Sequence, residues 1–347
     1  MQNNKKFMSR LQRSDAMLSK WSVFCVLAGM FFLHNEAYPQ STPEGTEWAT
    51  YRGIERCIKL FNGATTVILD PASGGRVVEY SVTGLNVLYQ SPEKPQEGQH
   101  VIKPDAGRFD IGPEMTAPER GPLWDGAWEA VITGPRSARL TSARDESSTG
   151  VQLVRDFLLD RASSHLRCTQ TIINISAETK RYNHWSRTLA VGGGICIVPL
   201  TPEYSRFPLG YIYYGPGSVL NYGHEEHPNI RVRDGYLELL GAPPQPKFGI
   251  DSYAGWFGYI TPTDLLFVKK FPVYPDRRYG EVAAYTISLW YFENETCELE
   301  PIGPTEILKP GAQASFTEDW WLLPYRYPKD RTVDLAVFMR YVQESTK

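Results

Sequence analysis

The residues best suited to proton transfer are a histidine and a pair of glutamates that lie far apart in the sequence. His184 lies in the stretch YNHWSRT, and its imidazole titrates near neutral pH, as an acid or base must. Glu298 and Glu300 would face the same side of a strand, where burial raises the pKa of a carboxyl toward the range of a general base. The alternatives are a histidine that fixes a loop through hydrogen bonds and an exposed strand with solvated charges.

A second group of candidates alternates charged and aromatic side chains in a glycine-rich stretch. Carboxylates and guanidinium groups pair with hydroxyls, and a Trp face can carry the apolar side of a sugar ring, so this stretch suits a polyol site. The alternative is a turn-rich surface loop with a local ion pair. The candidate binding residues are Arg108, Asp110, Glu114, Trp124 and Trp128.

Two other motifs are weaker. The segment Thr317–Trp321 (TEDWW) could place Asp319 at a cleft, although core packing of the two Trp residues is favoured. His224 and His227 have a metal-ligand spacing, but they lie in a loop flanked by Gly and Pro rather than on a helix face. We therefore expect no metal site.

The elements that must position these residues are mostly strands. Short apolar or alternating runs are separated by Gly/Pro turns, a pattern typical of β-strands. Only 332–343 has helical spacing, which predicts a short C-terminal helix. Strands without intervening helices indicate an all-β protein of packed sheets. The predicted strands cover 65–69, 76–82, 151–159, 165–175, 211–214, 237–240, 253–260, 265–271, 283–292 and 314–323, with loops at 91–104 and 241–247.

Composition agrees with a folded β protein. The 347 residues are 42% hydrophobic and 22% charged, which excludes disorder for most of the chain. The 9 Trp, 20 Tyr and 15 Phe residues, with 29 Gly and 26 Pro, favour aromatic-rich strands between turns. A net charge of -3 gives no reason to expect nucleic acid or an anionic membrane surface as a partner.

The N-terminus has the pattern of a secretory signal. Basic residues precede the apolar run Trp21–Leu33, which is shorter than the roughly 20 residues that span a bilayer. We expect a signal peptide over 1–40, cleaved within Ala37–Ser41, and an exported, periplasmic or secreted domain over 41–347 with no stable membrane span. An uncleaved anchor is the alternative.

The cysteines do not indicate a zinc site. Cys57, Cys168, Cys196 and Cys297 are widely separated and show no CxxC spacing. In an exported chain they could form up to two disulfides, or they could be buried thiols. We favour buried thiols.

Several of these motifs, in this order, resemble the aldose 1-epimerase (galactose mutarotase)-like superfamily, and within it the DUF4380 family of exported bacterial proteins. The resemblance spans roughly residues 55 to 325. It rests on four motifs: PASGGR at 71–76 followed by GLNVL at 84–88, Asn183-His184, Leu299-Glu300-Pro301, and LKPG at 308–311.

The resemblance implies a single β-supersandwich that binds a carbohydrate and needs no cofactor. His184 would be the acid and Glu300 the base at the anomeric carbon. Arg108 resembles the Arg that grips a sugar hydroxyl, Asp251 lies near the place of the family's Asp, and Arg187 completes the expected substrate shell. The chain departs from the pattern at 122–126, where PLWDG lacks the family's second His, and after Asn183-His184. The alternatives are action on another sugar derivative, binding without turnover, and a role as an accessory protein of the same fold.

Overall fold

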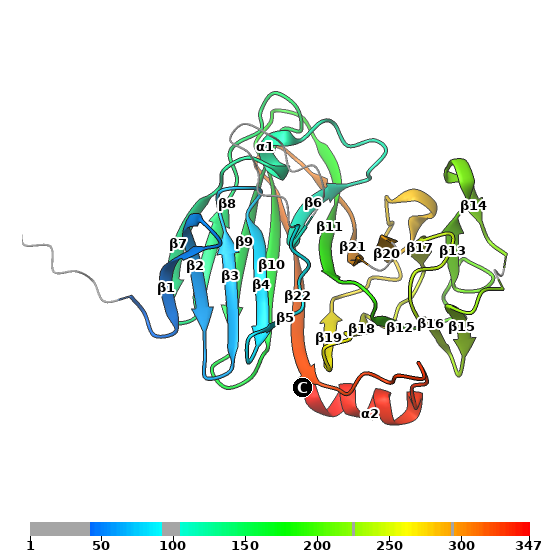
Figure 1. Ribbon diagram of the computed structural model, residues 1–347. Coiled ribbons are helices and arrows are strands. Elements are labelled where there is room, and N and C mark those ends of the chain that lie inside the picture. The colour runs from blue at the N-terminus through cyan, green and yellow to red at the C-terminus, as the bar shows by residue number, and fades with distance from the viewer. Residues whose placement is uncertain (1–41, 92–104, 224–225, 293–294) are drawn as a thin grey trace, which may run out of the picture. The chain divides into compact units, whose positions relative to one another are not determined.

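The computed structural model describes residues 42–91, 105–223, 226–292 and 295–347. Contacts group residues 42–347 into one compact unit. It is built of two large antiparallel sheets (Figure 1). The helices are α1 (Gly121–Trp124) and α2 (Leu335–Ser345), with single 3-10 turns at Pro216–Ser218 and Val282–Ala284.

The larger sheet contains 12 strands, and β5 (Leu85–Asn86) pairs with β4 outside the main order. The neighbours along the sheet are β1 (Thr46–Tyr51), β2 (Ile54–Phe61), β3 (Thr65–Asp70), β4 (Arg76–Val82), β6 (Gly107–Gly112), β11 (Lys180–Val191), β21 (Thr296–Leu308), β20 (Ile287–Phe292), β17 (Lys247–Ile250), β13 (Tyr211–Tyr214) and β14 (Leu220–Asn221). Strands distant in sequence, such as β6, β11 and β21, are therefore hydrogen-bonded neighbours.

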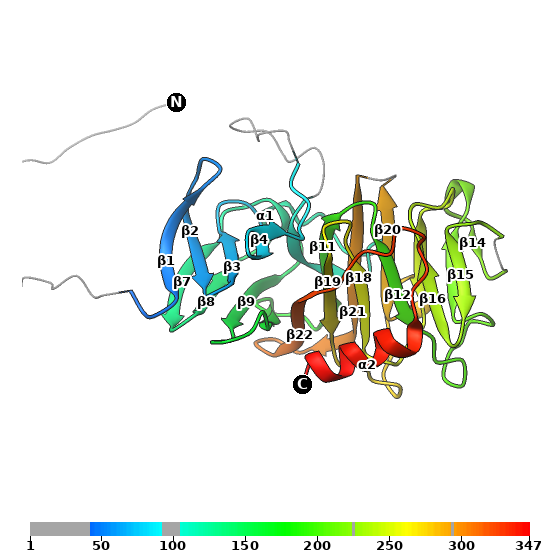
Figure 2. The same ribbon diagram turned by 60° about the horizontal axis from the view of Figure 1, so that its bottom comes forward.

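The smaller sheet contains 10 strands. Their order is β15 (Ile230–Arg233), β16 (Tyr236–Leu239), β12 (Ile195–Pro199), β18 (Trp256–Ile260), β19 (Leu265–Lys270), β22 (Gln313–Pro324), β10 (Leu166–Asn174), β9 (Val151–Leu159), β8 (Ser137–Thr141) and β7 (Glu129–Gly134). Its outer face is partly covered by α2, which lies along the ends of β12, β18 and β19 in Figure 2. Phe338 of α2 packs with Trp256 there, so the apolar face of the helix is buried.

The main core lies between the two sheets. Tyr80 of the larger sheet contacts Phe267 and Trp320 of the smaller one, with ring centroids 5.8 and 5.9 Å apart. Its hydroxyl donates to the carbonyl of Ser164, so the one polar atom of this ring is satisfied.

This core also contains a fully buried ion pair. Lys269 Nζ lies 2.8 Å from Glu318 Oε2, and both side chains are completely excluded from solvent. The same ammonium donates to the hydroxyls of Ser186 and Thr188 on β11, each at 3.0 Å. The pair thus joins the sheets through hydrogen bonds rather than through apolar contact alone.

Most predicted strands are confirmed, with shifts of a few residues at their ends. The expected helix at 332–343 is α2, which begins at Leu335 after Asp334 caps the amides of Ala336 and Val337. The predicted strand at 283–292 begins only at Ile287, because a 3-10 turn occupies Val282–Ala284. The predicted loop at 91–104 lies almost entirely outside the described residues.

Two stretches taken as loops or strand ends are strands. The stretch around His184 lies in the middle of β11, and the stretch around Arg108 forms β6. Both contain charged residues and lack clean alternation of hydrophobicity, because both of their faces are buried. The four cysteines Cys57, Cys168, Cys196 and Cys297 are unpaired and buried.

Candidate functional site

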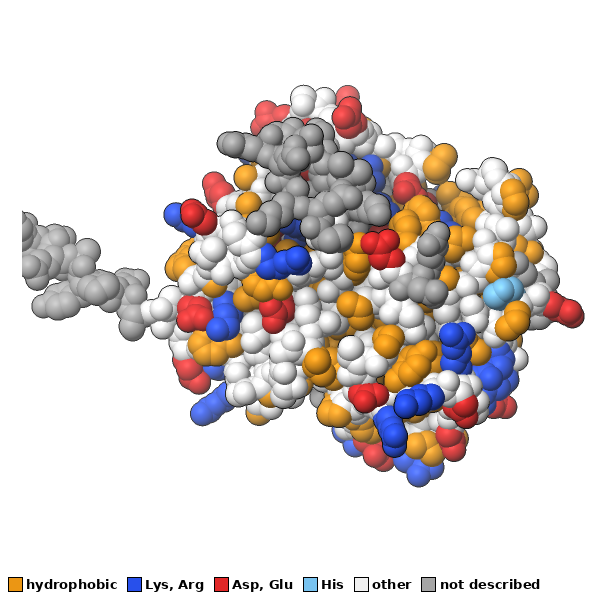
Figure 3. Space-filling model, viewed as in Figure 1, with side chains coloured by type: hydrophobic (Ala, Val, Ile, Leu, Met, Phe, Trp, Pro, Cys, Tyr) orange, Lys and Arg blue, Asp and Glu red, His pale blue; other side chains and the backbone are white. Residues whose placement is uncertain are grey.

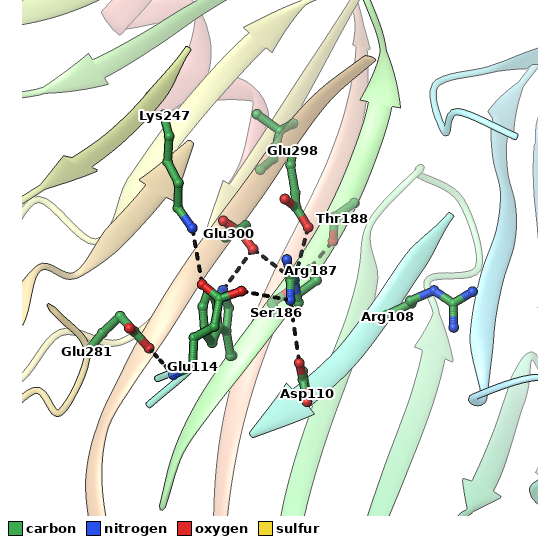
Figure 4. A network of polar contacts seen from close by, with 12 residues as sticks. Arg108, Asp110, Glu114, Ser186, Arg187, Thr188, Lys247, Glu281, Glu298 and Glu300 are labelled. Carbon is green, nitrogen blue, oxygen red and sulfur yellow. Dashed lines mark hydrogen bonds and ion pairs between the residues drawn. The ribbon is translucent and has the colours of Figure 1, made fainter. Parts of the chain in front are cut away.

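Five neighbouring strands of the larger sheet lie in the order β6-β11-β21-β20-β17, and all of them except β20 present charged side chains on the face turned away from the smaller sheet. Successive side chains of a strand point to opposite faces of the sheet, so every second residue of each strand lies on this face. Arg108 and Asp110 come from β6, and Glu298 and Glu300 come from β21. Arg187 of β11 lies between them (Figure 4), and Trp185 of the same strand points to the same face.

Arg187 is the centre of this group. Its Nε lies 3.0 Å from Glu298 Oε1 and 3.2 Å from Glu300 Oε1. Its Nη1 lies 3.6 Å from Asp110 Oδ2 and 3.7 Å from Glu114 Oε1. One guanidinium therefore faces four carboxyl groups, which hold its pKa well above the ordinary value against the opposing effect of burial. We call these residues, together with Lys247, the Arg187 network.

The floor of the network consists of Glu298 and Glu300, whose side chains are fully excluded from solvent. Burial and the neighbouring charge of Glu298 raise the pKa of Glu300 to about 8, although Arg187 and Lys247 oppose the shift. Trp185 Nε1 donates to Glu300 Oε1 at 2.8 Å. Oε2 of Glu298 has no hydrogen-bond partner, and the Ser288 hydroxyl lies across the strand pair from Glu300. A buried carboxyl that titrates near neutral pH can give or take a proton at physiological pH.

The rim of the network is formed by Glu114 and Lys247. Lys247 Nζ lies 3.1 Å from Glu114 Oε2, and the Glu114 side chain is 34% exposed, so solutes can reach this pair. The same ammonium lies 5.0 Å from the ring centre of Trp290, 5.3 Å from Tyr214 and 6.0 Å from Trp185. Three aromatic rings and a carboxylate thus fix one cation, and its pKa is raised despite burial because of Glu300 and Glu114.

Trp124, at the end of α1, continues the rim toward β6. The guanidinium groups of Arg108 and Arg187 lie 4.7 and 5.2 Å from its ring centre. Arg108 Nη1 also donates to the Trp124 carbonyl at 2.8 Å, which ties the segment after β6 to the sheet. Burial, followed by the charge of Arg76, lowers the pKa of Arg108 to about 10. Trp124 itself is half-buried, so part of its indole stays open to solvent.

Asp110 is held by a neighbouring arginine as well. Arg120 donates to its two carboxylate oxygens at 2.5 and 2.8 Å, a bidentate pair that leaves little freedom to the carboxylate. In the space-filling view, hydrophobic, acidic and basic side chains meet on the surface between the part that carries α1 and the part that carries β14 (Figure 3). This mixture of ring faces and charges suits a polar ligand with apolar patches.

His184 does not belong to this face. It alternates with Trp185 and Arg187 along β11, so its side chain points between the sheets. The imidazole stacks between Phe109 and Phe316, each 5.7 Å away between ring centres, and is fully buried. Its Nε2 lies 3.1 Å from the Ala314 carbonyl oxygen, and burial lowers its pKa to about 4.

The expected meeting of His184 and Glu300 across one cleft is therefore wrong. The backbone of the larger sheet lies between the two side chains, and the His184 imidazole is fully buried, so no solute reaches it. The alternative, a histidine that fixes a loop through hydrogen bonds, does not describe His184 either, because the residue lies within β11 and its ring packs between two aromatic rings. The chemical role of Glu300 remains a prediction.

Three other candidates lie elsewhere. Trp128 packs in the core, and its indole nitrogen donates to the Leu123 carbonyl at 3.1 Å. Asp251 is fully buried and accepts hydrogen bonds from Arg206. Asp319 lies on the smaller sheet with His165 at 2.6 Å. Of the predicted binding residues, the structure brings together Arg108, Asp110, Glu114, Trp124 and Arg187.

Lys247, Trp290 and the orientation of Trp185 were not predicted as site features. Lys247 opens the otherwise apolar strand KFGI directly after a Pro-rich loop, and a lone charge at that position was the available signal. Trp290 lies directly across the strand pair from both Lys247 and Glu298. Only the order of the strands in the sheet shows that Trp290 is a neighbour of these two charged residues.

The described part of the chain contains no group of three or more His, Cys, Asp and Glu residues arranged to hold a metal ion. His224 of the discounted His-x-x-His motif lies outside the described residues. The network's four carboxyl groups converge on a guanidinium, which occupies the position that a cation would need.

Many solved structures share this architecture, whereas the sequence comparisons found no match. No family model matches the chain, and no curated protein matches it. A galactose mutarotase-like protein from Lactobacillus casei aligns with a TM-score of 0.55 and 12% identity, over 77% of this chain and 100% of the other. A galactose mutarotase-like protein from Clostridium acetobutylicum gives 0.54 and 10%, over 81% and 99%.

A third structure, a galactose mutarotase related enzyme from Lactobacillus acidophilus, gives a TM-score of 0.54 and 8% identity, over 78% of this chain and 98% of the other. Identities this low establish the architecture and leave the chemistry open. The chain has the galactose mutarotase-like fold.

Proposed function

We propose that the protein binds a carbohydrate on the Arg187 network. The observation that carries this proposal is the combination, on one face of five adjacent strands, of aromatic rings at the rim with carboxylates and cations that can bond hydroxyls. Sugar rings present apolar faces and many hydroxyls, so they match such a surface. The resemblance to mutarotase-like proteins agrees with this ligand class.

The test is titration calorimetry of the wild-type protein across a panel of monosaccharides and oligosaccharides. Arg187→Met and Trp124→Ala should lose most of the affinity for any sugar that the wild type binds. Trp48→Ala is the matched control, because Trp48 is 44% exposed on the edge strand β1 and belongs to no part of the network. Equal losses in Trp124→Ala and Trp48→Ala, or no binding of any sugar, would contradict the proposal.

A second candidate function is epimerase-like acid–base chemistry at the anomeric carbon. The pKa of about 8 for Glu300 favours it, since that carboxyl is ready to exchange a proton near neutral pH. Polarimetry on fresh α-sugars would test it by comparing wild type with Glu300→Gln. Glu306→Gln, on the same strand but paired with Arg277 outside the network, is the control. Rates at background in all three proteins would rule out this chemistry for those sugars.

The proposal includes export and a closer tie to the DUF4380 family. Export rests on the basic and apolar pattern of residues 1–40, and the family tie on the motifs at 71–76, 183–184, 299–301 and 308–311. Among the described residues, no helix is both long and apolar enough to cross a membrane. Cell fractionation with sequencing of the mature N-terminus would test export. An N-terminus that still begins at Met1 in a cytoplasmic fraction would contradict it.

A further inference from the structure

The Arg187 network contains more carboxyl groups than cations. Two groups of charges are internally balanced: Asp110 of the network with Arg120, and, beside the network, Arg108 and Arg76 with Asp105 and Asp70. The remaining cations are Arg187 and Lys247. They lie near the carboxyl groups of Glu114, Glu281 and Glu298, whereas Glu300, with a pKa of about 8, keeps its proton at pH 7. Three carboxylates thus stand against two cations.

Glu281 belongs to this group through the backbone. Its carboxylate accepts a hydrogen bond from the amide of Glu114 at 3.0 Å, and it is 3% exposed. It therefore adds negative charge directly behind the rim pair of Glu114 and Lys247 (Figure 4). Water screens buried charges less than exposed ones, so the excess reaches a ligand at the rim, where the ligand's own charge stays open to screening by added salt.

The floor agrees with this excess of negative charge. Oε2 of Glu298 is buried and has no hydrogen-bond partner. Glu300, with a pKa of about 8, keeps its proton at pH 7, and its side chain lies across the strand pair from the Ser288 hydroxyl. The donors Arg187 Nε and Trp185 Nε1 are already engaged by these carboxyls, so no free donor of the floor faces the rim.

We propose that the network selects sugars that carry an ammonium group over neutral sugars, and neutral sugars over uronic acids. The inference rests on the proposed function and adds its substrate class. A protonated amine at the rim offsets the excess of carboxylates. A carboxylate or phosphate would meet Glu114 at the rim, and it would find both cations already paired.

The experiment uses matched ligands that differ only at C6. Glucose, galactose and mannose are each compared with their 6-amino-6-deoxy derivative and their uronic acid by titration calorimetry at pH 7 and low salt. For a hexose that binds, we expect the amine to bind about threefold to tenfold tighter and the uronic acid about tenfold weaker. Both differences should shrink in 0.5 M salt, where the Debye length falls to about 4 Å.

Two variants test whether the charge of the carboxylates, rather than the shape of the site, determines the selectivity. Glu114→Gln, at a partly exposed position that tolerates substitution, should reduce the ratio of amine to uronic acid affinity about fivefold. Glu298→Gln should reduce it further if the variant folds. Glu306→Gln, on the same strand and paired with Arg277, should leave it unchanged.

The outcomes distinguish this inference from the proposed function. If a uronic acid binds as tightly as its parent hexose, or if Glu114→Gln leaves the ratio unchanged, the selectivity is wrong while carbohydrate binding stands. If no hexose or derivative binds at all, the proposed function fails and the selectivity fails with it.

Discussion

His184 and Glu300 lie on opposite faces of the larger sheet, although their strands β11 and β21 are hydrogen-bonded to each other. His184 stacks between aromatic rings in the core, while Glu300 lies beneath Arg187 on the outer face. This relationship makes the two residues independent in experiments, because a change at one leaves the surroundings of the other intact.

Replacing His184 should leave sugar affinity unchanged. In His184→Phe the stack with Phe109 and Phe316 is kept, and the outer face of β11 is untouched. We expect an affinity within about twofold of wild type by calorimetry, a difference of less than about 0.5 kcal/mol. A loss as large as that of Arg187→Met would mean that His184 reaches the ligand after all.

The same variant should make the protein less sensitive to acid. The pKa of His184 is lowered by burial from 6.5 to about 4, so the unfolded chain binds this proton more tightly than the folded one. Its contribution to stability is present above pH 6.5 and is lost as the pH falls toward 4, by about 2–3 kcal/mol. Urea unfolding between pH 4 and 7 should show a shallower decline for His184→Phe. Parallel curves would contradict the assignment.

Glu300 should impose the opposite pH dependence. Its folded pKa is raised from 4.5 to about 8, so the folded state holds this proton more tightly. Stability from this group is complete below pH 4.5 and declines as the pH rises through 8, by about 2–4 kcal/mol. Glu300→Gln, which cannot ionise, should remove that decline in unfolding experiments from pH 5 to 9. Glu306→Gln should retain it.

The buried pair of Lys269 and Glu318 should be costly to break from one side. Lys269→Met leaves a carboxylate inside the core with Gln170 and Trp320 as its remaining donors. We expect a loss of about 3–5 kcal/mol in the free energy of unfolding by urea titration. The double variant Lys269→Met/Glu318→Leu should recover part of this loss, since the unpaired carboxylate is removed, although buried Arg155 then loses the nearby charge of Glu318. A double variant as unstable as the single one would show that the pair is net stabilising.

Gly74 should tolerate no side chain, because its turn supports Trp124. A Cβ at this position would lie 1.9 Å from the Trp124 carbonyl oxygen, and its φ is +68°. Gly74→Ala should lower stability by about 2–3 kcal/mol and weaken sugar binding, since that carbonyl also accepts from Arg108. Gly84→Ala is the matched control: its φ is +84°, but nothing lies within 4 Å of the added carbon. It should cost about 1 kcal/mol and leave binding intact.

The sequence alone determined the class of fold and the positions of many of its strands and turns. Strands and turns depend on residues only a few positions apart, so local sequence patterns predict them. Examples are the strand TTVIL at 65–69 and the turn PASGG at 71–75. The same local rule placed Glu298 and Glu300 on one face, because side chains alternate along any strand.

Tertiary structure alone decided which strands lie side by side and which face each one turns outward. Lys247 opens β17 and Glu114 follows β6, two strands that three others separate in the larger sheet, so their ion pair is a tertiary contact that no local pattern encodes. Alternation also could not say whether His184 or its neighbours Trp185 and Arg187 faced the core, since every residue of that stretch is buried. Where both faces of a strand are buried, the hydrophobic pattern no longer identifies the inner one.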